Sequence, residues 1–176
     1  IISDNINVEA GTGEIELVNA VVTNKISLVT ASSANFTIGK SKASLTEITA
    51  VNGDIVMHEV DSKSVIKTGA NAIVNKCIGE YDITCLGNFL TVQECKFTNA
   101  IINAQKTEVS FKFIQADYIE YNGSEVVCED FRIYSDGTTY LNQCSVDDKY
   151  INYSKGNAIG KGTLAEAILK QYGGIS

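Results

Sequence analysis

The sequence lacks several features that mark particular classes of protein, such as membrane and exported proteins. It contains no proline and only one histidine, and no apolar run approaches the roughly 20 residues that a membrane-spanning helix needs. The first residues, Ile1 to Asn5, lack the basic start and apolar centre of a signal peptide. We therefore expect no membrane insertion. Because the chain begins without methionine, we expect a processed product or a piece of a longer protein, from which an export signal could have been lost.

Composition and charge narrow the range of partners. The chain has 176 residues, of which 44% are hydrophobic and 20% charged, as in a globular protein. A single domain of this length buries roughly 70% of its unfolded surface. The net charge of −7 argues against phosphate backbones and anionic lipids as binding surfaces. We therefore expect no nucleic-acid partner.

The cysteines do not form a recognisable metal site. They are Cys77, Cys85, Cys95, Cys128 and Cys144. Five cysteines cannot all pair within one chain, and no C-x-x-C occurs. Zinc needs four close nitrogen or sulfur ligands, and His58 is the only histidine. Since Cys85 alternates with Ile83 and Cys95 with Phe97, we interpret the cysteines as small apolar core residues and expect neither a metal nor a cofactor.

No motif predicts a catalytic site. Gly160-Lys-Gly-Thr163 lacks the spacing of a phosphate-binding P-loop, and no Gly-x-Ser-x-Gly elbow is present. His58 precedes Glu59 and could in principle act as a general base. It is out of phase with Ile55 and Met57, so we expect it to face solvent from a strand.

The region from residue 117 to residue 148 is acidic. Its acids are Asp117, Glu120, Glu125, Glu129, Asp130, Asp136, Asp147 and Asp148. A solvated acidic face is one interpretation. The carboxylate groove of a β-helical polysaccharide hydrolase or lyase, or a weak calcium site without the usual ligand spacing, are the alternatives.

The sequence is rich in short alternations of apolar and polar residues. Ile15-Glu-Leu17, Ile26-Ser-Leu28 and Phe36-Thr-Ile38 are the first of many, and such period-2 stretches predict β-strands. Every second stretch begins about 19 residues after its predecessor. A fixed period near 20 residues indicates a repeat architecture, and two strands with two corners fill one coil.

We therefore predict an all-β fold, a single-stranded parallel β-solenoid (β-helix) of about eight coils between Asn5 and Tyr153. An antiparallel β-sandwich is the alternative. It is favoured by Asn52-Gly53, Asn122-Gly123 and Asp136-Gly137, which are dipeptides that two-residue hairpins prefer.

The end of the chain changes character. Thr163-Leu-Ala-Glu166 fits a capping box, apolar residues follow at helical spacing up to Tyr172, and Gly173-Gly174 supplies a stop. We predict a helix that covers the last coil. The expected organisation is a solenoid domain over residues 1–160 and a capping helix with a tail over residues 161–176.

The coils written "GEIELVNA", "NKISLVTA" and "GDIVMHEV" resemble the repeats of filamentous-haemagglutinin-type surface adhesins. The resemblance covers residues 5 to about 113 and rests on the period and on the G-[ED]-I-x-[LM] starts. It implies an extracellular or cell-surface rod without enzymatic activity. The cysteines depart from that family, which is usually poor in them. A cytoplasmic solenoid that polymerises end to end, similar to bactofilins, is the second choice.

The tyrosines are concentrated in the second half of the chain. Tyr121 and Tyr140, and likewise Tyr134 and Tyr153, are each separated by one such period, so we expect each pair to stack on successive coils. Exposed rings beside acids suit a polysaccharide chain or a partner protein, which includes a second copy of this chain. These four tyrosines are our candidate contact residues.

The sequence thus predicts a structural or adhesive β-solenoid segment of a surface or secreted protein, with no catalytic residues. A carbohydrate-binding or carbohydrate-active β-helix, and a cytoplasmic polymerising scaffold, are the alternatives.

Overall fold

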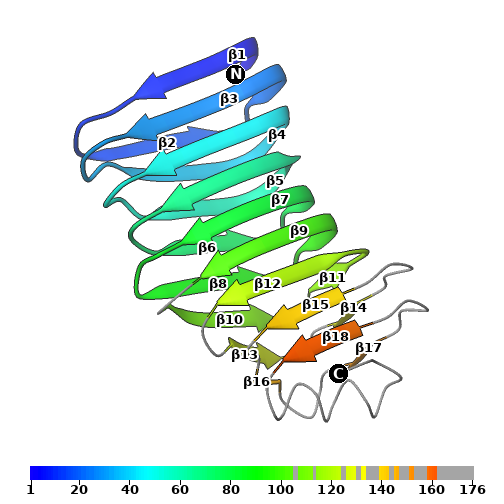
Figure 1. The fold of residues 1–176 in the computed structure, drawn as a ribbon. Coiled ribbons are helices and arrows are strands. Elements are labelled where there is room, and N and C mark those ends of the chain that lie inside the picture. The colour runs from blue at the N-terminus through cyan, green and yellow to red at the C-terminus, as the bar shows by residue number, and fades with distance from the viewer. Residues whose placement is uncertain are drawn as a thin grey trace.

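The structure is a computed structural model that describes residues 1–104, 107–112, 114–123, 126–129, 132–133, 139–142, 145–146, 151–152 and 158–161. Its strands pair only in parallel, each with the equivalent strand of the neighbouring coil. The chain therefore winds as a parallel β-solenoid, with the N-terminus at one end of the stack (Figure 1). This confirms the predicted solenoid. The antiparallel sandwich is wrong, because no pairing among the described strands is antiparallel.

One side of each coil is a short strand, which we call the first face. Its strands are β2 (Glu14–Val18), the start of β4 (Asn35–Ala50), the start of β5 (Ile55–Thr68), β6 (Ala72–Asn75), β8 (Phe89–Gln93), β10 (Glu108–Lys112), β13 (Val126–Glu129) and β16 (Ser145–Val146).

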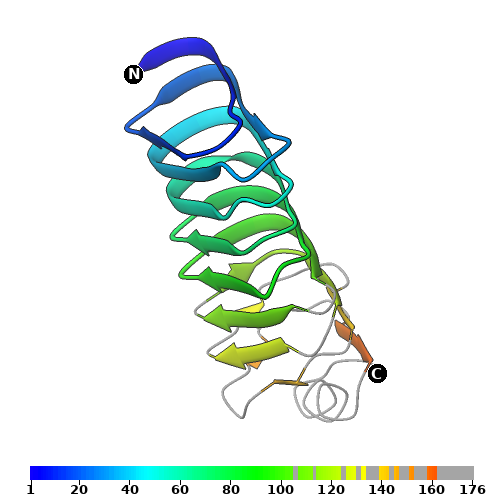
Figure 2. The same cartoon turned by 90° about the vertical axis from the view of Figure 1, so that its left-hand side faces the viewer.

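The rest of each coil has a short second face and a longer third face. Their strands are β1 (Ile2–Glu9), β3 (Val21–Thr30), the later parts of β4 and β5, β7 (Ile78–Cys85), β9 (Lys96–Ala104), β11 (Gln115–Ala116), β12 (Ile119–Gly123), β14 (Arg132–Ile133), β15 (Thr139–Asn142), β17 (Ile151–Asn152) and β18 (Ala158–Lys161). Shifts of register separate the two faces in β3, β4 and β9. Figure 2 shows how the faces close into successive coils.

Two kinds of turn join the first face to the others. The αL corner, between the first and second faces, has one non-glycine residue of positive φ in each of five successive coils of the described part: Asn19, Lys40, Glu59, Lys76 and Glu94, with φ from 48° to 55°. The loop corner, between the third and first faces, consists of residues 10–13, 31–34, 51–54, 69–71 and 86–88.

The core is a set of columns that run along the stack. On the first face, Leu17, Ile38, Met57, Val74, Val92 and Phe111 pair in register. On the third face, Leu28, Ile48, Ile66, Ile83, Ile102 and Tyr121 do the same. All of these side chains are buried. On both the first and the third face, the apolar residues of the period-2 alternation thus point into the interior, and the residues between them point outward.

Coil length is less regular than the period of the sequence predicts. Ile15 pairs with Phe36, whereas Ile55 pairs with Ala72, so the first of these two coils is longer than the predicted period and the second is shorter. The described part forms about six turns. The prediction of eight coils extends into residues outside those described and stays a prediction. The predicted helix from Thr163 to Tyr172 also lies outside them, and the described residues include no helix.

Candidate functional site

The polar side chains of the loop corner form a ladder along the stack. The Oδ1 of Asn35 accepts a hydrogen bond from the backbone N of Asp54 at 2.9 Å. The Oδ1 of Asp54 accepts from the backbone N and the Nδ2 of Asn71 at 3.0 and 3.1 Å. The Oδ1 of Asn71 accepts from the backbone N of Asn88 and of Phe89, both at 3.1 Å. Each side chain thus satisfies backbone groups of the next coil, so the carboxylate of Asp54 has a structural role.

Threonines at the end of the third face support the same corner. Thr30, Thr68 and Thr107 each donate from Oγ1 to a glycine carbonyl of the loop corner, over distances of 3.3, 2.8 and 2.9 Å. The backbone N of Ala70 in turn donates to the hydroxyl of Thr68 at 2.8 Å. These buried or half-buried hydroxyls add to the backbone hydrogen bonds that join successive coils at this corner, such as that from the N of Asn52 to the carbonyl of Ser32 at 3.1 Å.

Charges alternate in sign along the αL corner. Lys40, Glu59, Lys76 and Glu94 occupy equivalent positions in four successive coils. The Nζ of Lys76 lies 3.8 Å from the Oε2 of Glu94. Neighbouring coils lie about 4.8 Å apart, so opposite charges at this spacing attract while remaining accessible to water. The corner is a solvated row of compensated charges.

His58 lies in β5 beside this corner. Its side chain is 37% exposed, as expected for a strand residue that faces solvent. Its Nε2 lies 2.8 Å from the Oε1 of Glu59, and its Nδ1 lies 3.2 Å from the Nδ2 of Asn75. Both ring nitrogens are therefore engaged by neighbouring side chains, which fixes the orientation of the ring along the coil.

A hollow on the second face arises from a change in coil length. Between the second and third faces, the chain takes three steps from Ile78 to Tyr81 but four from Lys96 to Ala100 in the next coil. Gly79 pairs with Phe97 and Glu80 with Asn99, so the additional residue, Thr98, has no register partner in the preceding coil. The wider coil overhangs the narrower one at this step.

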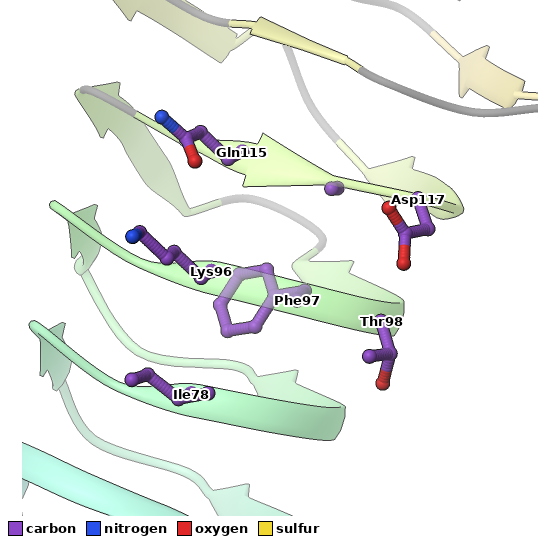
Figure 3. A pocket seen from close by; sticks show the side chains of 7 residues that line it. Ile78, Lys96, Phe97, Thr98, Gln115 and Asp117 are labelled. Carbon is purple, nitrogen blue, oxygen red and sulfur yellow. The ribbon is translucent and has the colours of Figure 1, made fainter.

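The hollow has a volume of about 370 Å³. Its lining residues are Ile78, Lys96, Phe97, Thr98, Gln115, Ala116 and Asp117. Figure 3 shows Lys96 and Gln115 on one side of Phe97, with Thr98 and Asp117 on the other. Ile78 is 49% exposed, whereas Phe97 is buried and packs on Tyr81 with ring centroids 5.0 Å apart. The arrangement combines an apolar floor with donors and acceptors at both ends.

The polar groups around the hollow differ from charged groups elsewhere on the rod. In the same column, Lys42 pairs with Asp61 at 3.0 Å, and on the third face Lys63 pairs with Glu80 at 3.0 Å. Within the part of the chain that the structure describes, the side chains of Lys96 and Asp117 form no such ion pair. Both are exposed, so their charges are available to a ligand.

Sequence reasoning missed this hollow. Lys96, Thr98 and Gln115 belong to no motif, and the one-residue difference between coils is hidden by the irregular period. The ladder of the loop corner did leave a signal, since Asn35, Asp54, Asn71 and Asn88 recur at coil spacing.

A second concavity, of about 350 Å³, lies on the first face beside Glu14, Glu16, Asn35 and Asp54. The Oδ1 atoms of Asn35 and Asp54 are already used by the ladder. Among the described residues, no three His, Cys, Asp or Glu side chains gather in a way that suits a metal ion.

The structure places only two of the four candidate tyrosines, Tyr121 and Tyr140. Tyr121 is fully buried and contacts Phe111 edge to face, with ring centroids 5.6 Å apart, so it does not fit the expected surface contact. Its register partner is Leu141, while Tyr140 pairs with Glu120. The expected stacking of Tyr121 on Tyr140 is therefore wrong, because this coil has one residue more than predicted. Tyr134 and Tyr153 lie outside the described residues.

The acidic region is described only at its start. Asp117 is exposed at the hollow. Glu120 accepts hydrogen bonds from the hydroxyl of Tyr118 at 3.1 Å and from the Nδ2 of Asn122 at 2.8 Å. The side chains from Glu125 onward are not described, so the carboxylate groove stays a prediction. Cys77, Cys85 and Cys95 are buried and unpaired, which confirms them as core residues.

Comparison of the chain with protein-family models, curated proteins and solved structures found no match. The described part of the chain contains no helix that is long and apolar enough to cross a membrane.

Proposed function

We propose that this chain is a structural or adhesive β-solenoid segment without enzymatic activity, which carries binding surfaces on the sides of a rod. The observation that carries the proposal is the continuity of the stack. Buried columns, the ladder of Asn35, Asp54 and Asn71, and the compensated charges of the αL corner all run from coil to coil. These features suit a rigid body that displays its sides to a partner.

The direct test measures binding and turnover in the same samples. The purified chain is incubated with a panel of polysaccharides, and bound protein and newly formed sugar ends are both measured. We expect binding of protein or polysaccharide surfaces without new reducing or unsaturated ends. Release of such products in proportion to protein concentration would contradict the proposal and favour a polysaccharide hydrolase or lyase.

A carbohydrate-binding role is the second candidate, and the hollow on the second face favours it. A sugar ring has an apolar face and hydroxyls that both donate and accept. Ile78 offers an apolar floor, Lys96 a donor and Asp117 an acceptor. The volume of about 370 Å³ lies within the range of small-molecule sites.

This second role is tested with Lys96→Ala and Asp117→Asn. Lys42→Ala is the matched control, since Lys42 lies in the same column but outside the hollow. If an oligosaccharide binds here, both hollow variants should lose at least tenfold in affinity while the control keeps it. Equal affinity in all three variants would place any sugar contact elsewhere.

Self-association and compartment belong to the same proposal. Among the described strands only β3 pairs with β1, so the other edge of β1 is open to a further strand. We propose an extracellular or cell-surface location. A cytoplasmic polymerising scaffold is the alternative, favoured by three buried free thiols. Sedimentation over a range of concentrations tests self-association, and fractionation of the native cells distinguishes the compartments.

A further inference from the structure

Cys77 and Cys95 occupy the same position in two successive coils. Each directly follows the αL residue of its coil, Lys76 or Glu94. The backbone N of Lys96 donates to the carbonyl oxygen of Cys77 at 2.9 Å, and the strands continue in register from Ile78 with Lys96. The two cysteines are therefore direct neighbours across one coil step.

Their sulfur atoms point into the same buried space. The Sγ of Cys77 donates to the carbonyl of Asn75 at 3.3 Å. The Sγ of Cys95 donates to the carbonyl of Gln93 at 3.1 Å and lies 3.5 Å from that of Val74, which belongs to the preceding coil. Both residues have an exposed fraction of 0%. The thiol of Cys95 thus reaches across the coil step toward Cys77.

The two thiols also affect each other's ionisation. The side-chain hydrogen bond with Cys95 lowers the pKa of Cys77 against the opposing effect of burial. The same hydrogen bond, together with burial, raises the pKa of Cys95. In the closed coils Cys77 is therefore the sulfur that ionises more readily.

The backbone spacing suits a covalent bond. Neighbouring parallel strands lie about 4.8 Å apart, and disulfides join residues whose Cα atoms are roughly 4.4 to 6.8 Å apart. We propose that Cys77 and Cys95 are a disulfide site, at which oxidation joins two successive coils covalently. This inference does not depend on the proposed function.

The oxidant is a low-molecular-weight disulfide such as oxidised glutathione. The thiolate of Cys77 attacks one of its sulfurs, and one glutathione leaves as a thiolate. Cys95 then loses its proton and attacks the sulfur of Cys77 in the mixed disulfide, which releases the second glutathione. Two protein S–H bonds are replaced by one S–S bond, and the oxidant takes up the two electrons and two protons. Since both thiols are buried, the exchange takes place while the coils close during folding.

Cys85 is a matched control within the same chain. It is buried like the other two, and burial raises the pKa of its thiol. However, it lies at the loop corner, where its Sγ approaches the carbonyls of Ala70 and Phe89 at 3.3 and 3.5 Å. Its neighbourhood contains no second thiol among the described residues.

The experiment maps the bond in the complete chain. The protein is refolded with reduced and oxidised glutathione, its remaining thiols are alkylated, and it is cleaved after glutamate. Cleavage after Glu59, Glu80, Glu94 and Glu108 puts Cys77, Cys85 and Cys95 into three fragments, and cleavage after Glu129 separates Cys128 from Cys144. We expect residues 60–80 joined to residues 95–108, with Cys85 alkylated. Alkylation of both Cys77 and Cys95, or a bond from either to another cysteine, would overturn the proposal.

A second measurement uses variants with little expected disturbance. Ser41 follows the αL residue of an earlier coil, as Cys77 does in its own coil. Its hydroxyl donates to the carbonyl of Gly39 at 2.8 Å, so the serine in Cys77→Ser should keep the equivalent bond to the carbonyl of Asn75. Oxidised wild-type protein should melt roughly 5 to 10 °C above its reduced form, because the bond closes a loop of one coil. The gain should vanish in Cys77→Ser and persist in Cys85→Ala. An equal gain in Cys77→Ser would contradict a bond at this site.

Discussion

The αL corner and the loop corner turn the chain through the same solenoid by different means. The αL corner relies on backbone conformation, with one residue of positive φ in each coil, and none of these five residues is glycine. The loop corner relies on side chains, because Asn35, Asp54 and Asn71 hold the backbone of the following coil. Backbone hydrogen bonds join successive coils at both corners. The αL corner adds a strained backbone conformation, and the loop corner adds side-chain hydrogen bonds between coils.

This difference determines which substitutions each corner tolerates. An αL residue such as Lys40 points to solvent and has no required side chain, so many residues fit at the cost of about 1 kcal/mol of conformational strain. At the loop corner successive coils come so close that some positions exclude any side chain. A Cβ added at Gly53 would lie 1.8 Å from the carbonyl oxygen of Ala34.

The strongest way to break the loop corner is Gly53→Ala. The clash is with backbone, which cannot move without opening the ladder, so we expect a loss of roughly 3 to 5 kcal/mol in the free energy of unfolding. Urea denaturation followed by circular dichroism measures it. Gly11→Ala is the control, because a Cβ there meets nothing within 4 Å, and its effect should stay within about 0.5 kcal/mol. Equal losses in both variants would mean that close approach is not what requires glycine.

A smaller loss is expected from Asn71→Ala. This change removes the acceptor for the backbone N of Asn88 and Phe89 and the donor to Asp54. The bond to Asp54 is half-buried, whereas the backbone N of Asn88 and of Phe89 is exposed, so the loss should be about 1 kcal/mol. Asn52→Ala, at an exposed asparagine of the same corner, should change the free energy of unfolding by less than about 0.5 kcal/mol. If Asn71→Ala were as mild as its control, water would be replacing the ladder.

The parallel solenoid could be predicted because its signal is repeated in every coil. Apolar residues such as Ile38, Met57 and Val74 alternate with polar ones, and the same columns result where a coil is two residues shorter than the period, as between Met57 and Val74. The register itself could not be predicted from a fixed period. Val74 pairs with Met57, whereas the fixed period of the sequence pairs it with Ile55, because coil length changes with the corners.

The surface was harder to predict for a physical reason. The hollow beside Lys96 and Asp117 depends on a difference of one residue between two successive coils, at the step from the second to the third face, which leaves no local pattern. The αL residues other than Asn19 could not be predicted, because Lys and Glu carry no turn signal. The dipeptide Asn52-Gly53 favours a hairpin in the sequence, whereas in the structure Gly53 is needed for its missing Cβ.

Substitution by glycine should raise the free energy of unfolding at the αL corner and lower it within a strand. Lys40 has φ of 48° and is exposed, with no ion pair among the described residues. Lys40→Gly removes the strain of a left-handed side chain, so we expect a net gain of about 0.5 kcal/mol after the entropy of the unfolded chain is counted. Lys67→Gly, at an exposed position within β5, should lose about 1 kcal/mol. Equal losses in both variants would show that the αL residues are not strained.

The smallest effect concerns the alternating charges of the αL corner. Added salt weakens these charge interactions but does not change the backbone strain, so it distinguishes the two contributions. Glu59 lies between Lys40 and Lys76 in the column of αL residues and contacts His58. Glu59→Gln removes an attraction, and Glu59→Lys places three like charges in a row. Since the Glu59 side chain is 41% exposed, each step should cost no more than about 0.5 kcal/mol at low ionic strength. Urea denaturation at low salt and at about 1 M salt should show the differences shrink, because the Debye length falls to roughly 3 Å. Differences that persist at high salt would assign them to backbone conformation at position 59, and the charges would then contribute nothing to this corner.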